Sequence, residues 1–212
     1  MINKSNSISI RGRTWLWLAV LLALAPPRAP AALDAPRAAP EPAGRFYARQ
    51  WDAMMARNWA EEEACVSALG RGCNLAELQV LIDGLSGAAV MRQLLEVNRA
   101  INRATYREDR RNWGRRDHWA APRELLADGG DCEDFAIAKY LALRGLGFPA
   151  ADLRLLILFD TRRQRAHAVL AVALDGRELV LDNLGGAILP LSELPHYRVH
   201  YALNEAGLVT HR

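Results

Sequence analysis

Apolar residues recur every three or four positions in the first half of the chain and at alternate or continuous positions in its last third. The first spacing is typical of amphipathic helices and the second of strands. The helical spacing predicts helices over residues 46–64, 75–85 and 87–102. A polar stretch with interleaved aromatic residues, 106–119, follows and is expected to form a loop.

Two further helices are predicted in the middle of the chain. Pro122 suits the first turn of a short helix that ends at the glycine pair 129–130, because proline lacks only an N–H that has no partner there. The second, Cys132–Arg144, carries the strongest helix signals. Asp131 is a good N-cap and Asp134 takes the position of the acidic partner in a capping box. Gly145 or Gly147 is expected to end this helix.

The last third predicts strands over residues 153–159, 165–174 and 178–184, and a further strand near 197–203. The dipeptide Asp175-Gly176 lies between the second and third and is a strong signal for a two-residue hairpin turn. Helices followed by an antiparallel sheet make an α+β domain.

The turn also fixes a register that brings two polar residues together. If Asp175 and Gly176 are the turn residues, Asp182 lies opposite Val169, and His167 lies diagonally from Asp182 on the same face. Such diagonal neighbours are about 7–8 Å apart at Cα, within reach of an imidazole–carboxylate hydrogen bond. A slip of one residue would place them on opposite faces.

The first residues have the features of an export signal. Three basic residues precede an apolar run, 14–25, which is shorter than the about 20 residues that span a bilayer. Small residues at alternate positions follow directly before residue 32, as at a signal-peptidase site. We expect residues 1–31 to be a secretory signal peptide, with an uncleaved membrane anchor as the alternative. Residues 32–44 are a Pro/Ala-rich linker, and 45–212 one domain.

The net charge depends on whether this leader is counted. The sequence has 27 Lys and Arg residues against 24 Asp and Glu, but four of the basic residues and none of the acidic ones lie in residues 1–31. The remainder has 23 basic and 24 acidic residues, a net charge of −1. This near-neutral charge and the lack of a polybasic tract give no indication that the partner is nucleic acid or an anionic membrane.

The three cysteines are Cys65, Cys73 and Cys132. Cys65 and Cys73 are separated by a glycine-containing segment that allows a turn, so we expect them to form a disulfide in an oxidising compartment. This leaves Cys132 as a free thiol. A free cysteine is often a buried apolar residue, but the acidic neighbours of Cys132 argue against that interpretation.

Cys132 stands at a helix start, where a thiol is readily activated. The helix N-terminus lowers the pKa of a thiol, and its free N–H groups suit an oxyanion. Asp131, Glu133 and Asp134 oppose this effect, because negative charges raise the pKa of a neighbouring thiol. The conflict predicts a cation or an imidazolium close to Cys132.

His167 is the best candidate base, because among the five histidines only it lies within a predicted core strand. Asp182 is the acid that orients it, which gives a Cys–His–Asp arrangement. Asn183 is a weaker candidate, since it points to the other face in this register. In the structural alternative, His167 makes a core polar contact and Asp182 caps a strand end.

The residues around these positions resemble those of the bacterial transglutaminase-like cysteine proteinases, the LapG-like periplasmic proteases. The similarity lies in the segments GDCEDFAIAKY (130–140), DHWAAP (117–122), AHAVL (166–170), LDNL (181–184) and YALN (201–204). It covers about Trp51–Asn204. One departure is Ala168, where the family commonly has a bulkier apolar residue, which we interpret as a packing change.

The resemblance implies a transglutaminase-like, papain-like fold with Cys132, His167 and Asp182 as the triad. It also implies a periplasmic protease that needs Ca²⁺, bound by Asp131 and Glu133 with Asp134 as a further candidate ligand. Such proteases cut the N-terminal region of large surface adhesins, typically at paired alanines, and so release biofilm cells. They are held by an inner-membrane receptor that responds to cyclic di-GMP. Ordinary N-capping is the alternative role of the acidic residues, and the two roles are compatible.

Other functions stay open on the sequence alone. The same triad also performs transglutamination or amide hydrolysis on another substrate, since all three pass through a thioester. A calcium-responsive binding protein that docks a receptor without cutting is a second class. A metal site of Cys and His ligands is disfavoured, because there is no CxxC pair and no second histidine at ligand spacing.

Overall fold

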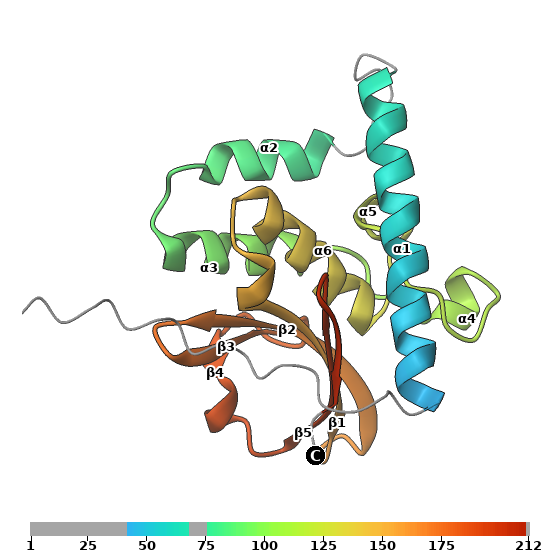
Figure 1. Cartoon of the computed structure of the whole chain (residues 1–212), viewed down its shortest axis with the longest axis vertical. Helices are drawn as coiled ribbons and strands as arrows, with labels where there is room; N and C mark the ends of the chain where they lie inside the picture. The colour runs from blue at the N-terminus through green and yellow to red at the C-terminus, as the bar shows by residue number, and fades with distance from the viewer. Residues whose placement is uncertain (1–41, 68–75, 211–212) are drawn as a thin grey trace, which may run out of the picture.

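The computed structural model describes the backbone of residues 42–67 and 76–210 (Figure 1). The predicted signal peptide, most of the predicted linker and the predicted Cys65–Cys73 pair lie outside the residues or side chains that it describes. None of the described helices is long and apolar enough to cross a membrane.

Six α-helices precede six strands in the described chain. The helices are α1 Pro42–Ser67, α2 Ala76–Leu85, α3 Val90–Ile101, α4 Asp109–Asn112, α5 Pro122–Asp128 and α6 Cys132–Gly145. The strands are β1 Leu153–Asp160, β2 Arg165–Leu174, β3 Arg177–Leu181, β4 Leu189–Pro190, β5 Tyr197–Asn204 and β6 Gly207–Thr210. Short 3₁₀ turns lie at Ala150–Asp152 and Leu191–Glu193. The α+β prediction is confirmed.

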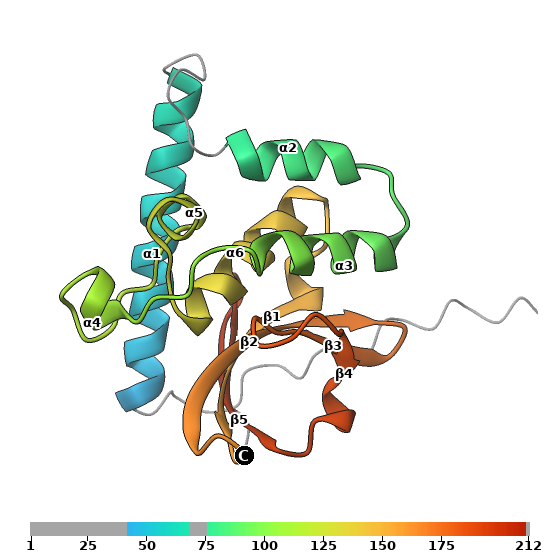
Figure 2. The ribbon, with the colours of Figure 1, turned by 180° about the vertical axis from the view of Figure 1, so that it is seen from behind.

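The strands form one antiparallel sheet in the order β4-β3-β2-β1-β5-β6. The helices gather on one side of this sheet, and α6 lies between α3 and the strands (Figures 1 and 2). The main core fills this space with apolar residues of α1, α3, α6 and the facing side of β1 and β2. A smaller cluster covers the other side of the sheet, where Leu191, Leu194 and Tyr197 pack against Leu156 and Val169. The sheet is therefore covered on both faces around its central strands.

The predicted hairpin register is confirmed. Leu174 pairs with Arg177 and Leu170 with Leu181. Asp175 and Gly176 have φ values of 50° and 75°, as a type I′ turn requires.

Several boundaries differ from the prediction. The β3 strand ends at Leu181 rather than at residue 184, because the Leu184 N–H turns back to the Asp182 carboxylate, 2.9 Å away. The predicted loop 106–119 contains the one-turn helix α4, and strands β4 and β6 were not predicted. These three elements are four residues long or shorter, too short for a periodic pattern.

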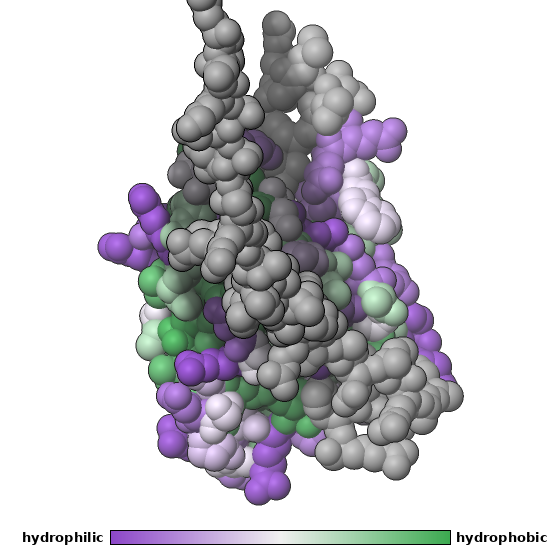
Figure 3. Space-filling view, turned by 60° about the vertical axis from the view of Figure 1, so that its left-hand side comes forward, coloured by the Kyte–Doolittle hydropathy of each residue, from purple (hydrophilic) through white to green (hydrophobic). Residues whose placement is uncertain are grey.

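Apolar residues also reach the surface. Some of them are visible in green on the face shown in Figure 3. The exposed large apolar side chains include Val90, Met91 and Leu95 of α3 and Leu184 and Leu189 near the β3–β4 connection.

Candidate active site

Cys132 is the first residue of α6, and the glycine pair 129–130, which precedes the N-cap Asp131, is held against another segment. The Gly130 N–H donates to the Thr105 carbonyl (3.1 Å), and the Arg107 N–H donates to the Gly130 carbonyl (2.8 Å). A Cβ at Gly130 would lie 2.2 Å from the Asp134 Oδ2 atom. Glycine is therefore required where the chain enters the helix that carries the thiol.

Asp134 fixes the start of this helix. Its carboxylate accepts hydrogen bonds from the N–H groups of Asp131 (2.9 Å) and Ala120 (2.6 Å). The first bond caps α6, and the second ties the segment before α5 to the start of α6. Both oxygens of Asp134 thus have backbone partners, so its capping role is present whatever else it does.

His167 and Asp182 lie side by side at one end of the sheet. His167 is in β2, Asp182 directly follows β3, and the His167 Nε2 atom is 2.9 Å from the Asp182 Oδ1 atom. Both side chains are largely buried. Asn183 lies beside a second cavity, and its Oδ1 atom has no hydrogen-bond partner among the described residues. The imidazole therefore pairs with Asp182 rather than with Asn183.

The Asp182 carboxylate has further donors. The Tyr197 hydroxyl donates to Oδ2, and the Leu184 N–H donates to Oδ1. Burial alone would raise the pKa of Asp182, but its contacts with His167, Tyr197 and Leu184 outweigh burial and lower the pKa to about 2. Asp182 is therefore an anion at all physiological pH values.

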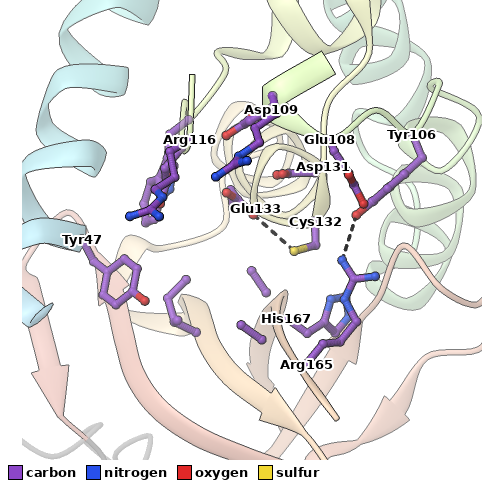
Figure 4. Close-up of a pocket in the computed structure, with 16 residues that line it drawn as sticks. Tyr47, Tyr106, Glu108, Asp109, Arg116, Asp131, Cys132, Glu133, Arg165 and His167 are labelled. Carbon is purple, nitrogen blue, oxygen red and sulfur yellow. Dashed lines mark hydrogen bonds between the residues drawn. The ribbon is translucent and has the colours of Figure 1, made fainter. Parts of the chain in front are cut away.

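A cavity of about 330 Å³ joins the start of α6 to β2. Cys132 and His167 both line it, with the acidic residues on the helix side and His167 and Arg165 on the strand side (Figure 4). A smaller cavity of about 160 Å³ also has Cys132 and His167 in its wall. The structure thus brings the predicted thiol and imidazole to one cavity. The Cys132 Sγ atom donates to Glu133 Oε2 (3.2 Å), however, and not to His167.

The acidic residues form a cluster above the thiol. Ligand atoms of Asp109, Asp117 and Glu133 lie within 4.8 Å of one another, as do those of Asp109, Asp131 and Asp134. Buried oxygens of Asp109 (Oδ1) and Asp131 (Oδ1) have no hydrogen-bond partner in the described chain. Such clustered carboxylate oxygens are the donor set that Ca²⁺ prefers.

Burial and repulsion within the cluster disfavour ionisation. Both raise the pKa of Asp131 and of Glu133, and the pKa of Asp134 rises mainly through burial. Burial, followed by the charges of Glu133 and Asp131, raises the pKa of the Cys132 thiol well above its ordinary value. The conflict between acidic neighbours and an active thiol, expected from the sequence, is therefore present in the fold.

Sequence reasoning missed three residues here, Asp109, Asp117 and Tyr197. The sequence predicts a loop at Asp117, and Asp109 lies in the short α4 helix within the same segment. Their closeness to residues 131–134 is a tertiary contact with no local pattern. Tyr197 was predicted only as part of a strand, and the sequence carries no signal that its hydroxyl reaches Asp182.

The chain is similar to a known protein family and to solved structures. Residues 71–204 match the family profile described as bacterial transglutaminase-like cysteine proteinase. The structure is similar to that of Legionella pneumophila LapG, with 35% sequence identity, a TM-score of 0.59, and coverage of 65% of this chain and 77% of LapG.

Two further LapG structures match at 34% identity. The calcium-bound form has a TM-score of 0.59 and covers 65% of this chain and 77% of LapG; the EGTA-treated form has a TM-score of 0.60 and covers 66% and 76%. Comparison with curated proteins gives no match. Because the family profile matches well over half of this chain, the chain belongs to the bacterial transglutaminase-like cysteine proteinases.

Proposed function

We propose that this chain is a calcium-dependent cysteine endopeptidase in which Cys132 is the nucleophile, His167 the base and Asp182 the residue that orients the base. The observation that carries the proposal is the 2.9 Å contact between His167 Nε2 and Asp182, at a cavity that Cys132 also lines. A Cys–His–Asp set of this kind, with the His–Asp pair buried, is the arrangement that acyl transfer through a thioester requires.

The tautomer of His167 follows from its partner. Because Nε2 faces a carboxylate, Nε2 carries the proton in the neutral ring, and Nδ1 is left to accept the thiol proton. The sulfur first turns from Glu133 toward the imidazole and then attacks the scissile carbonyl. The resulting oxyanion is stabilised by N–H groups at the α6 start, and the imidazolium protonates the leaving amine. Water, deprotonated by His167, then hydrolyses the thioester.

Calcium fits the acidic cluster on the chemistry of its donors. Asp131 and Glu133 are the proposed ligands, and the unpartnered oxygens of Asp109 and Asp131 support adding Asp109 and Asp117 to the set. Asp134 belongs to the same group, although its backbone hydrogen bonds make it a support for the others as well. When bound, the ion supplies positive charge that offsets the carboxylates beside the thiol.

Removal of one cluster carboxylate tests the calcium proposal. In Asp131→Asn, the rise in melting temperature on adding Ca²⁺ should shrink, because a ligand that binds only the folded state stabilises it in proportion to its affinity. Asp128→Asn, at an exposed position outside the cluster, is the matched control. An equal calcium response in all three proteins would remove the calcium assignment.

The substrate, location and partner are proposed from family membership. We propose that the chain is exported through residues 1–31 to the periplasm and cuts the N-terminal region of a large surface adhesin at paired alanines. A cyclic di-GMP receptor in the inner membrane is the proposed regulator. Cleavage of a peptide with a central Ala-Ala pair, compared with transfer of its acyl group to an added amine, distinguishes proteolysis from transglutamination.

Substitution of the triad tests the catalytic assignment. Cys132→Ala should abolish cleavage, and Asp182→Asn should lower kcat by several orders of magnitude, because an amide favours the wrong imidazole tautomer. Asp175→Asn, in the turn at the opposite end of the β2–β3 hairpin from His167 and Asp182, is the matched control and should cut at the wild-type rate. Wild-type activity in Cys132→Ala would overturn the assignment.

A further inference from the structure

Tyr197 holds the second oxygen of the Asp182 carboxylate. It is the first residue of β5, and its hydroxyl donates to Asp182 Oδ2. Its ring also lies 5.8 Å from the His167 ring, centroid to centroid, at an interplanar angle of 60°. Tyr197 therefore contacts both residues of the acid–base pair, from a strand that lies beyond β1 in the sheet order.

The carboxylate is fixed because its two oxygens have different partners. Oδ1 serves His167 and the Leu184 N–H, both at 2.9 Å. Among the described residues, the hydrogen bond to Oδ2 comes from Tyr197. Without the hydroxyl donor, only the two contacts to Oδ1 restrain rotation of the carboxyl plane about its Cβ–Cγ bond, so the direction of Oδ1 toward Nε2 is less strictly fixed.

Tyr197 is itself firmly placed. Its N–H donates to the Leu194 carbonyl (2.9 Å), and it pairs with Asp160 of β1. The neighbouring His196 carbonyl accepts from both the N–H (2.9 Å) and the hydroxyl (3.1 Å) of Thr161. A backbone anchored on both sides gives the hydroxyl a defined position, as a residue that supports a catalytic group requires.

We propose that Tyr197 is a positioning residue of this enzyme, which keeps Asp182 aligned so that His167 presents Nδ1 to Cys132. The inference rests on the proposed function, since it assigns a role to the same triad. Tyr197 acts through Asp182 and does not touch the reacting atoms.

Tyr197→Phe tests this role, because it removes the hydroxyl and keeps the ring. We expect kcat for peptide cleavage to fall about tenfold with KM unchanged, the effect of one hydrogen bond to a charged group. Tyr140→Phe is the matched control, because the Tyr140 hydroxyl also donates to a carboxylate, that of Glu205 (3.2 Å), outside the site. Both variants should lose similar stability, but only Tyr197→Phe should lose kcat.

A readout that needs no activity separates this inference from the proposed function. In ¹⁵N NMR spectra of the full-length protein, neutral His167 should be the Nε2–H tautomer in the wild type and in Tyr140→Phe, and a mixture of tautomers in Tyr197→Phe. If the wild type cuts no peptide, the proposed function fails while this test still decides the role of Tyr197. An unchanged tautomer in Tyr197→Phe, or a loss of kcat equal to that of Tyr140→Phe, would overturn the inference.

Discussion

Lys139 makes the stability of this fold depend on pH in an unusual direction. It lies in α6, its side chain is fully buried, and its Nζ atom has no hydrogen-bond partner among the described residues. Burial lowers the pKa of Lys139 from 10.5 to about 7, and the charge of Asp182 only partly opposes this effect. We therefore expect Lys139→Met, which removes the amine and keeps most of the side-chain volume, to abolish a specific pH dependence.

The size of the effect follows from the two pKa values. Between about pH 7 and 10.5 the unfolded chain binds a proton at Lys139 that the folded chain does not, so the free energy of unfolding rises with pH in this range. Within this range, each pH unit raises the free energy of unfolding by up to about 1.4 kcal/mol. From about pH 7 to 9 the wild type should therefore gain about 2 kcal/mol relative to Lys139→Met. Below about pH 7 both states of the wild type are protonated at Lys139, and the cost of burying the charge is constant.

Urea unfolding of both proteins at several pH values measures this difference, because all other titrating groups are common to them. The assignment can also be checked directly, since the sequence has only one other lysine, Lys4, and ¹⁵N-lysine spectra are correspondingly simple. A difference in unfolding free energy that stays constant from about pH 7 to 9 would refute the reasoning.

Two further changes test the packing and charge of the site. Gly130→Ala should destabilise the fold by about 1–3 kcal/mol, because its Cβ would lie 2.2 Å from the Asp134 Oδ2 atom. The control Gly84→Ala in α2 meets no atom within 4 Å and should be neutral or stabilising in thermal unfolding. Equal melting temperatures for the two variants would contradict this prediction. The lowered pKa of Asp182 contributes about 2 kcal/mol of stability above pH 3.8, which is lost as the pH falls through about 2. Asp182→Asn should therefore be less stable than Asp175→Asn in urea at neutral pH, and the gap should close near pH 2; a gap that persists there would exclude this source of stability.

The hairpin shows why part of the site was predictable from sequence. A two-residue Asp175-Gly176 turn leaves one register, and that register places His167 within reach of Asp182. The α6 start was equally readable, because capping residues act within four positions of one another. Local rules therefore predict the two parts of the proposed triad separately: the thiol at the α6 start, and the His–Asp pair on the hairpin.

The remaining features depend on contacts between distant segments. Tyr197 reaches Asp182 only because the 182–196 connection returns the chain to the far side of β1. Asp109 approaches Asp131 and Asp134 because the 105–107 segment runs beside Gly130. Neither contact leaves a periodic or spacing signal, so the sequence alone does not predict it.

The central claim is that Cys132, His167 and Asp182 act together on a peptide bond through a thioester. The most direct test is mass spectrometry of the protein quenched in acid during turnover of a peptide with a central Ala-Ala pair, in the presence of Ca²⁺. We predict an acyl adduct on the fragment that contains Cys132 in the wild type, and no adduct in His167→Ala. Cleavage with the acyl group on another residue, or cleavage by Cys132→Ala without any adduct, would contradict the account.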